Sequence, residues 1–405
     1  MKRYWKIISI CLVTLMVIGT FYIQSSFATN EHLTVEFEKT NGNVDEVKNI
    51  RLYGDYLLVD NLHRYQRYTP LQITNVETID PYDLPFLQKL KKISVLPLFE
   101  DLIKQHKNFM RGKDLAHPYF FEDENRLVYA SIEAKNHVQP MTDLTFAIEV
   151  LNKKSEEITS IQLDVPNSEN YGWMHVEDVQ VIEDELKVIT RGFRTNSEYE
   201  LRVFTFDINE QKLVTTYTIT STPVVENGWS DLRIINDGYS IQRDDYLLMK
   251  IEAFEDNMGH RDGEPKKITN EFIVYDIVNN QSKKIVGPSE VLDSIGSASI
   301  FNSTLFIPSH SVHGVDINRY DIENDKWDTK LTFDLGNTKD DEGGSYIKLM
   351  NGKLYLTYAT TNGHTLFIGD VETGESLYEG QLKVKNNGED QMDYHLYFHE
   401  IEYVQ

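Results

Sequence analysis

The feature that most constrains the fold is a turn that recurs along the chain. In each copy a strand-like apolar run ends at an Asp or Asn, and a second strand-like run begins a few residues later. The clear copies are centred on Asp207, Asp276, Asp321 and Asp370, and weaker copies on Asn75 and Val150. Because an Asp or Asn side chain accepts a hydrogen bond from the backbone two residues on, it stabilises a tight turn between paired strands. The repetition predicts one antiparallel module used several times.

A second turn signal alternates with the first. It is an Asn, Asp or Gly turn followed by a leucine-led apolar run, and its six copies begin at Gly54, Glu124, Glu183, Asp244, Phe301 and Asn351. The alternation gives six four-stranded units, and the last Asp turns are 45 and 49 residues apart (Asp276 to Asp321 to Asp370). A period of about 40–50 residues is typical of a β-propeller blade. We therefore predict an all-β fold, a β-propeller of six four-stranded repeats; a β-sandwich or several small β domains are the alternatives.

The two ends of the chain leave the blade count open. Alternating apolar residues predict one strand at 32–39 and another at 395–403. Pairing of these two strands would close the ring and hide two sheet edges that otherwise invite aggregation. The two termini would then supply a composite seventh blade.

Two short stretches resemble known propeller repeats. Tyr320-Asp321 followed by Trp327, with Asn351 to Tyr355, resembles the kelch repeat without its paired glycines. Gly369 to Tyr378 is similar to the repeat of quinoprotein-type propellers, with Tyr378 where tryptophan is usual. Both resemblances imply propeller topology only. No catalytic or cofactor-binding residue of either family has a matching position, so we expect no cofactor.

Residues 1–28 are predicted to be a targeting segment, and 29–405 the propeller domain. Lys2, Arg3 and Lys6 precede an uncharged apolar run of 17 residues, from 7 to 23, and Ser26 and Ala28 suit the −3 and −1 positions of a signal-peptidase site. The run fits either a cleaved signal peptide or an N-terminal membrane anchor. Because the positive charges stay inside, both outcomes place the remaining chain outside the cytoplasm, secreted or anchored to the cell membrane.

Cysteine usage and charge narrow the compartment and the partners. The one cysteine, Cys11, lies in the targeting segment, and a mature chain without disulfides favours a bacterial cell envelope over an animal secreted protein. The formal net charge is −24. Nucleic acid is therefore not an expected partner, and direct adhesion to anionic lipid is disfavoured, because both need a basic face. We expect a membrane link only through the N-terminal segment.

Residues 81–113 break the strand pattern and predict a small helical insertion. Apolar residues from Leu98 to Met110 recur at helical spacing, and Pro97 suits a first helical turn. Between 86 and 113 there are seven basic and two acidic residues on an otherwise acidic chain. The insertion is either a helical cap packed on the propeller or a lid or docking surface. Its candidate partner contacts are Lys89, Lys91, Lys92, Lys104, Lys107 and Arg111.

Motifs of common chemistries are absent from the sequence. It has no Gly-x-Ser-x-Gly, no glycine-rich phosphate loop and no His-Glu-x-x-His, and the polar loops 257–265 and 337–344 lack calcium-loop spacing. His310, His313 and Asp316 form the nearest metal-like group, but their spacing in a β region favours ordinary loop histidines. Trp173 and Trp229 each follow a glycine just before a blade, near the central channel, where a ring either packs between blades or stacks on a ligand.

These observations support three hypotheses. The first is an exported, non-enzymatic binding or accessory protein of the bacterial cell envelope, which recognises another envelope protein or a small ligand through one face of the ring. The second is an extracellular propeller enzyme, a glycosidase, lyase or metal-dependent hydrolase, with carboxylates and histidines at the channel mouth. The third, a quinone-dependent dehydrogenase, rests on the Asp370 to Tyr378 turn alone.

Overall fold

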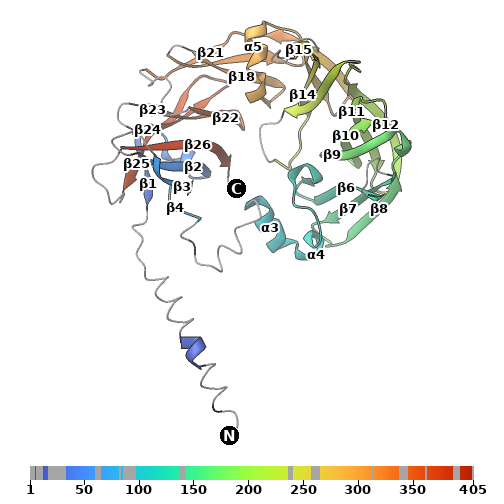
Figure 1. The fold of residues 1–405 in the computed structure, drawn as a ribbon, viewed down its shortest axis with the longest axis horizontal. Coiled ribbons are helices and arrows are strands. Elements are labelled where there is room, and N and C mark those ends of the chain that lie inside the picture. The colour runs from blue at the N-terminus through green and yellow to red at the C-terminus, as the bar shows by residue number, and fades with distance from the viewer. Residues whose placement is uncertain are drawn as a thin grey trace.

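The computed structural model describes residues 33–403 except 60–64, 82–83, 85–96, 137–141, 236–239, 257–264, 312, 337–344, 361–362 and 386–392; before residue 33 it describes Trp5 and residues 12–16. The described strands form six antiparallel sheets that follow one another around a ring (Figure 1). Each sheet is one blade of a six-bladed β-propeller. The predicted fold is confirmed.

Within each blade the strands run from the ring's inner side to its rim. The first blade has β26 (Asp393–Tyr403), β2 (Ile50–Val59), β3 (Tyr65–Ile73) and β4 (Thr78–Ile79). The second has β5 (Phe120–Glu122), β6 (Arg126–Asn136), β7 (Thr142–Asn152) and β8 (Ile158–Asp164). The third has β9 (Tyr171–Ile182), β10 (Glu185–Arg194), β11 (Tyr199–Asp207) and β12 (Lys212–Ser221).

The other three blades have the same order. The fourth has β13 (Gly228–Ile235), β14 (Tyr246–Glu255), β15 (Lys266–Asp276) and β16 (Gln281–Ile285). The fifth has β17 (Ser299–Phe301), β18 (Thr304–Ser311), β19 (Gly314–Asp321) and β20 (Lys326–Trp327), and β21 (Leu331–Asp334) also pairs with β19. The sixth has β22 (Tyr346–Met350), β23 (Lys353–Thr360), β24 (Gly363–Asp370) and β25 (Ser376–Lys385), with β1 (Thr34–Gly42) outside β25.

Short helices occupy connections between strands. They are η1 (Val44–Val47), α3 (Pro97–Gln105), α4 (Lys107–Met110), η2 (His117–Tyr119), η3 (Ser168–Asn170), α5 (Ser289–Asp293) and η4 (Ile295–Ser297). Among the described residues, none of the helices combines the length and apolar character that a membrane span needs.

The clear Asp turns have the predicted geometry. Asp207 Oδ1 accepts hydrogen bonds from the backbone N–H groups of Asn209 (2.9 Å) and Glu210 (2.8 Å), and Asp276, Asp321 and Asp370 cap their turns in the same way. The apolar residue after each Asp donates its N–H to the other turn of its blade; the pairs are Ile208 to Asp184, Ile277 to Asp245, Ile322 to Ser303 and Val371 to Gly352. The two turn signals alternate in the sequence because, in these four blades, the two turns lie side by side at the same end of the strands.

One predicted turn is wrong, and a weaker one is displaced. Gly54 lies inside β2, at a register shift opposite β26. A Cβ at Gly54 would lie 2.6 Å from the carbonyl oxygen of Tyr397, so glycine is needed for close approach of a neighbouring strand at a bulge. The turn expected at Val150 instead follows Asn152, whose side chain accepts from the backbone of Lys154 at 2.9 Å.

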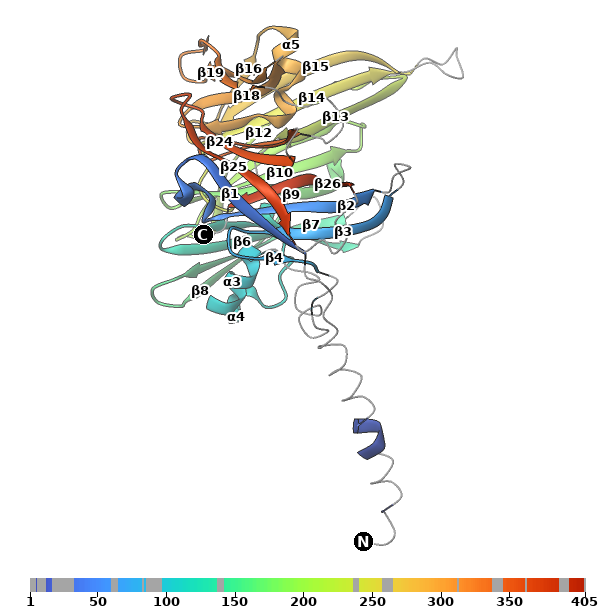
Figure 2. The same cartoon turned by 90° about the vertical axis from the view of Figure 1, so that its left-hand side faces the viewer.

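The termini close the ring by a different pairing from the one predicted. β26 is the innermost strand of the first blade, next to β2, whereas β1 is a fifth, outermost strand on β25 of the sixth blade (Figure 2). β1 therefore does not pair with β26, and the described residues form no seventh blade. Each terminus instead covers one exposed edge of an existing sheet, which removes a site for aggregation.

Apolar clusters join neighbouring blades around the ring. They lie between the second and third, third and fourth, fourth and fifth, fifth and sixth, and sixth and first blades. Between the second and third blades, for example, the rings of Phe146 and Phe204 lie 4.8 Å apart. Figure 1 shows α3 and α4 between the first and second blades. Their apolar residues Phe99, Leu102, Phe109 and Met110 pack on the second blade, which is the predicted small helical insertion.

Candidate functional site

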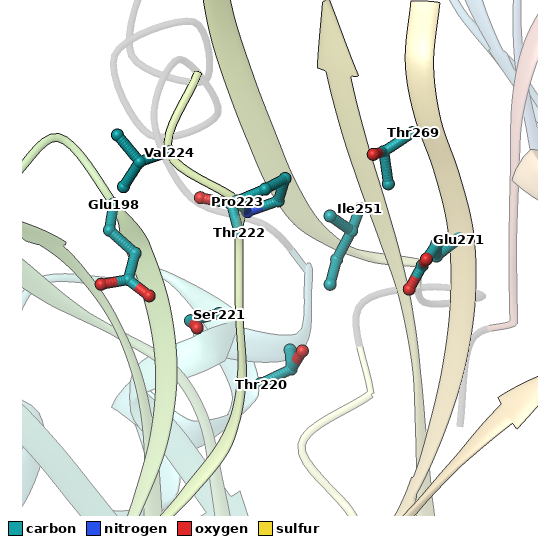
Figure 3. A pocket seen from close by; sticks show the side chains of 9 residues that line it. All are labelled: Glu198, Thr220, Ser221, Thr222, Pro223, Val224, Ile251, Thr269 and Glu271. Atoms are coloured by element: carbon teal, nitrogen blue, oxygen red, sulfur yellow. The ribbon is translucent and has the colours of Figure 1, made fainter. Parts of the chain in front are cut away.

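A groove of about 500 Å³ lies between the third and fourth blades (Figure 3). One wall comes from the end of β12 and the connection that follows it, and the other comes from β14 and β15. Figure 3 shows the carboxylates of Glu198 and Glu271 on opposite sides. Between them lie the hydroxyls of Thr220, Ser221, Thr222 and Thr269 and the apolar side chains of Pro223, Val224 and Ile251.

One hydrogen bond between the two blades and several bonds within them hold the groove in shape. Thr222 Oγ1 accepts hydrogen bonds from Tyr199 N (3.0 Å) and from Ser230 Oγ (2.9 Å), which belongs to the fourth blade. Glu271 forms an ion pair with Lys284 at 2.8 Å, and Glu198 accepts from the Asn196 side chain at 3.0 Å. The lining contains two carboxylates and no basic side chain, so it suits a ligand that is cationic or rich in hydrogen-bond donors.

A second candidate cluster lies on β9, the innermost strand of the third blade. Asp178 is opposite Ile189 and Val176 is opposite Thr190, so Glu177 is an extra residue at a β-bulge. Bulges re-aim side chains and are common beside active sites. Glu177 Oε1 lies 2.7 Å from Arg191 Nε. Burial raises the pKa of Glu177 in spite of Arg191, and it raises the pKa of Asp178 to about 6.

Titratable and aromatic groups surround this bulge. Burial lowers the pKa of His175, and nearby Arg191 lowers it further. The Trp173 ring lies 5.0 Å from the His175 ring. Burial, reinforced by nearby groups that include Glu177, raises the pKa of the Tyr119 phenol in η2. Perturbed pKa values gathered on one strand beside the axis mark a candidate site for proton transfer or ligand binding.

A segment from the fourth blade reaches this part of the ring. The backbone N–H of Asp244 donates to Gln180 Oε1 (3.0 Å), and Ile241 O accepts from Glu122 N (2.7 Å) on the second blade. The Gln180 amide donates in turn to the Asp178 carboxylate at 3.2 Å. The residues before β14 thus help to orient Asp178.

The predicted partner contacts lie elsewhere. Lys104, Lys107 and Arg111 are exposed on α3, on α4 and after α4, and Lys104 forms an ion pair with Asp101 at 2.8 Å. Lys113 is buried instead, where its ammonium donates to Glu149 Oε2 and to Phe109 O, both at 2.6 Å, and fixes the insertion to the second blade. Lys89, Lys91 and Lys92 lie outside the described residues, as do Ser26 and Ala28.

The metal-like group of the sequence is not assembled into a site. Asp316 accepts hydrogen bonds from Lys330 Nζ and Thr332 Oγ1, both at 2.6 Å. In the part of the chain that the structure describes, no three His, Cys, Asp or Glu side chains are placed to hold a metal ion. The bulge cluster was missed at the sequence level. The sequence contains one signal for this cluster, the acidic pair Glu177-Asp178 after His175 within a strand. The signal is not specific, because many acidic pairs occur in this chain.

The arrangement of six antiparallel sheets around a ring places this protein in the class of six-bladed β-propellers. No protein-family model matches the chain, and no curated protein matches it. Among solved structures it is similar to TolB from Acinetobacter baumannii, with 11% identity over 86% of this chain and 67% of that chain and a TM-score of 0.29. It is also similar to a mutant of the Synechocystis apocarotenoid oxygenase (9% identity, 82% and 70% covered, TM-score 0.36) and to the WD40 domain of SCAP from fission yeast (14%, 64% and 61%, 0.26).

Proposed function

We propose that the protein is an exported binding or accessory protein of the bacterial cell envelope that holds a cationic group in the groove between the third and fourth blades. The ligand is a basic segment of another envelope protein or a small cation. The observation that carries this proposal is the lining, where Glu198 and Glu271 lie on opposite sides of the groove, with hydroxyl groups in the lining between its walls. Part of the lining belongs to strands of the two blades, whose order is already fixed, so these residues lose little entropy when a ligand enters.

Export is supported by the composition of residues 1–28, with its basic start, apolar run and small residues at Ser26 and Ala28. Mass spectrometry of the protein purified from the producing cell tests this part. A mature N-terminus at Thr29 means cleavage, and an intact Met1 in the membrane fraction means an anchor. Intact protein in the cytoplasm contradicts export.

The groove is tested with a fluorescent peptide of alternating Ser and Lys and with its Ser-Glu counterpart. The basic peptide should bind and the acidic one should not. Glu198→Gln with Glu271→Gln should weaken binding about tenfold or more, because two charge-assisted contacts are lost. The matched control is Glu290→Gln, an exposed glutamate on α5, which should leave binding unchanged. Equal binding of both peptides contradicts the proposal.

The helical insertion is the alternative contact, and crosslinking separates the two surfaces. A photo-crosslinking amino acid is placed at Thr220 in one variant and at Lys107 in another, and both are expressed in the producing bacterium. A partner captured from position 220 alone supports the groove. A partner captured from position 107 alone assigns recognition to the insertion, through Lys104, Lys107 and Arg111.

The bulge on β9 favours a second candidate function, that of an extracellular glycosidase or lyase. A carboxyl group with a pKa of about 6, such as Asp178, is partly protonated near neutral pH and can act as a general acid. We would assay 4-nitrophenyl glycosides and acidic polysaccharides. A rate that falls as the pH rises through about 6, and that Asp178→Asn abolishes, supports the enzyme; no turnover of any substrate leaves binding as the function.

A further inference from the structure

Side chains on one face of the fourth blade form cross-strand rows. In the first row Trp229 of β13 lies opposite Phe254 of β14, which lies opposite Lys267 of β15. In the second row Asp231 lies opposite Glu252, and in the third Arg233 lies opposite Lys250. The third row continues to Phe272, which is buried in the cluster shared with the fifth blade. The rows of Trp229 and Asp231 lie outside this packed contact with the fifth blade.

Trp229 presents an open ring at a fixed position. It is 48% exposed, although its indole stacks on the Phe254 ring at 4.3 Å and 23°. A Cβ on Gly228 would lie 1.9 Å from the Phe254 carbonyl oxygen, so glycine there lets β13 approach β14 closely. One ring face is therefore held by Phe254, while the indole still shows much of its surface to solvent.

The third blade contains the equivalent position, and there the ring is packed. Trp173 also follows a glycine and lies opposite a phenylalanine, Phe193. Tyr199 lies against its ring at 5.9 Å, and the Arg191 guanidinium carbon lies 5.7 Å from its centre. The repeat thus uses this tryptophan for packing in one blade and leaves it exposed in the next. Because Trp229 stacks on Phe254 on one side only, its fixed and partly exposed ring is a candidate binding surface.

Cations gather beside the exposed ring. The carboxylate of Glu252 is contacted at 2.8 Å by Arg233, Lys250 and Lys267. Burial raises the pKa of Glu252, but Lys250 and Lys267 outweigh burial and lower it to about 2. The side chains of Arg233 and Lys267 remain 53% and 44% exposed, so both present N–H donors to solvent. Together the three rows contain three cations, Arg233, Lys250 and Lys267, and two carboxylates, Asp231 and Glu252. This face is therefore locally positive on a chain whose net charge is −24.

We propose that this face of the fourth blade binds an acidic sugar, a saccharide whose ring carries a carboxylate. The apolar face of the sugar ring stacks on the open side of Trp229. The carboxylate accepts hydrogen bonds from Arg233 and Lys267, because a guanidinium fork matches the geometry of a carboxylate. A local excess of one positive charge suits one carboxylate per ring and not a dense polyanion. The site lies on the opposite face of the fourth blade from the groove, so the two sites are independent.

The test measures binding of three probes to the full chain by titration calorimetry and by Trp fluorescence. Trigalacturonic acid has both the ring and the charge, its methyl ester has the ring alone, and triglutamate has the charge alone. We expect saturable binding of trigalacturonic acid, binding of the ester that is weaker by about tenfold, and no binding of triglutamate. Equal binding of triglutamate, or no binding of trigalacturonic acid at millimolar concentration, overturns the proposal.

Variants assign the site. Trp229→Ala should weaken binding of trigalacturonic acid about tenfold or more, whereas Trp229→Phe, which keeps a ring, should restore part of it. Arg233→Gln should weaken binding about fivefold. The matched control is Arg243→Gln, which changes an arginine of similar exposure (51%) that also pairs with a carboxylate, and it should have no effect. Circular dichroism checks that each variant is folded. Unchanged binding by folded Trp229→Ala contradicts the assignment.

Discussion

The closure of the ring should be sensitive to pH through one histidine. His364, on β24 of the sixth blade, is 5% exposed, and its Nε2 accepts a hydrogen bond from the backbone N–H of Leu396 on β26 at 3.3 Å. Its Nδ1 has no hydrogen-bond partner among the described residues. Burial, with His395 nearby, lowers the pKa of His364 from 6.5 to about 4. The neutral imidazole is therefore part of the contact between the sixth blade and the closing strand.

The sign and size of the effect follow from this shift. The unfolded chain takes up a proton near pH 6.5 and the folded chain only near pH 4, so the stability from neutral His364 is complete above about pH 6.5 and is lost as the pH falls to about 4. A difference of this size corresponds to about 3 kcal/mol, at about 1.4 kcal/mol for each pKa unit. Near pH 4 the contribution of neutral His364 to the stability of the fold should therefore be lost.

The perturbation is His364→Gln, which keeps an acceptor for the Leu396 N–H but does not titrate. Urea denaturation of both proteins gives the free energy of unfolding at several pH values between about 7.5 and 4. The difference between wild type and variant should change by about 3 kcal/mol over this range. Other titrating groups, such as Asp178 and Glu252, are present in both proteins and cancel. Two parallel stability curves would refute the reasoning.

Three further substitutions test other parts of the structure, each by urea denaturation. Phe398→Ala removes a buried ring from the closing strand and should cost about 3–5 kcal/mol; a cost under about 1 kcal/mol would mean that β26 contributes little to the ring. Glu200→Ala should cost about 3 kcal/mol, because Glu200 is 2% exposed and pairs with two arginines at 2.6 and 2.7 Å, while exposed Glu210→Ala should cost under about 0.5 kcal/mol. Asp178→Asn should stabilise the protein by about 3 kcal/mol near pH 8, because burial raises the pKa of this carboxyl, and the gain should vanish near pH 4; a gain that does not vary with pH contradicts that shift.

The blades could be predicted from the sequence because their turns are local. An Asp side chain such as that of Asp321 caps its own turn through backbone two or three residues away, so the signal and the structure occupy the same few residues. The closure could not be predicted in this way. β26 pairs with β2 across nearly the whole chain, and no local pattern distinguishes β2 from β1, the predicted partner, which pairs with β25 instead. Gly54 did carry a signal of closure, but a glycine needed for close approach looks the same in sequence as a glycine in a turn.

The candidate sites were predicted only in part, for a similar reason. The glycine-tryptophan pairs at Trp173 and Trp229 are correctly placed at the start of innermost strands. Their exposure depends on which side chains of the neighbouring strands cover them: Trp173 packs against Tyr199 and Arg191 of its own blade, whereas Trp229 stacks on Phe254 and stays 48% exposed. The groove lies between two blades, so its lining combines residues that neither repeat brings together alone. The bulge at Glu177 is a shift in the pairing register between β9 and β10, and no residue pattern in the sequence marks the position of that shift.

One departure from the repeat lies between the first and second blades. The insertion separates the first blade from the second, and the innermost strand of the second blade, β5, is only three residues long. Just before it, η2 at the end of the insertion packs on β9, and there Tyr119 is close enough to Glu177 for that carboxylate to raise the pKa of its phenol. Tyr119, which follows the inserted helices, thus joins Glu177, Asp178 and His175 of β9 in one group of side chains with shifted pKa values, and a search for a pH-dependent ligand or a proton transfer should begin here.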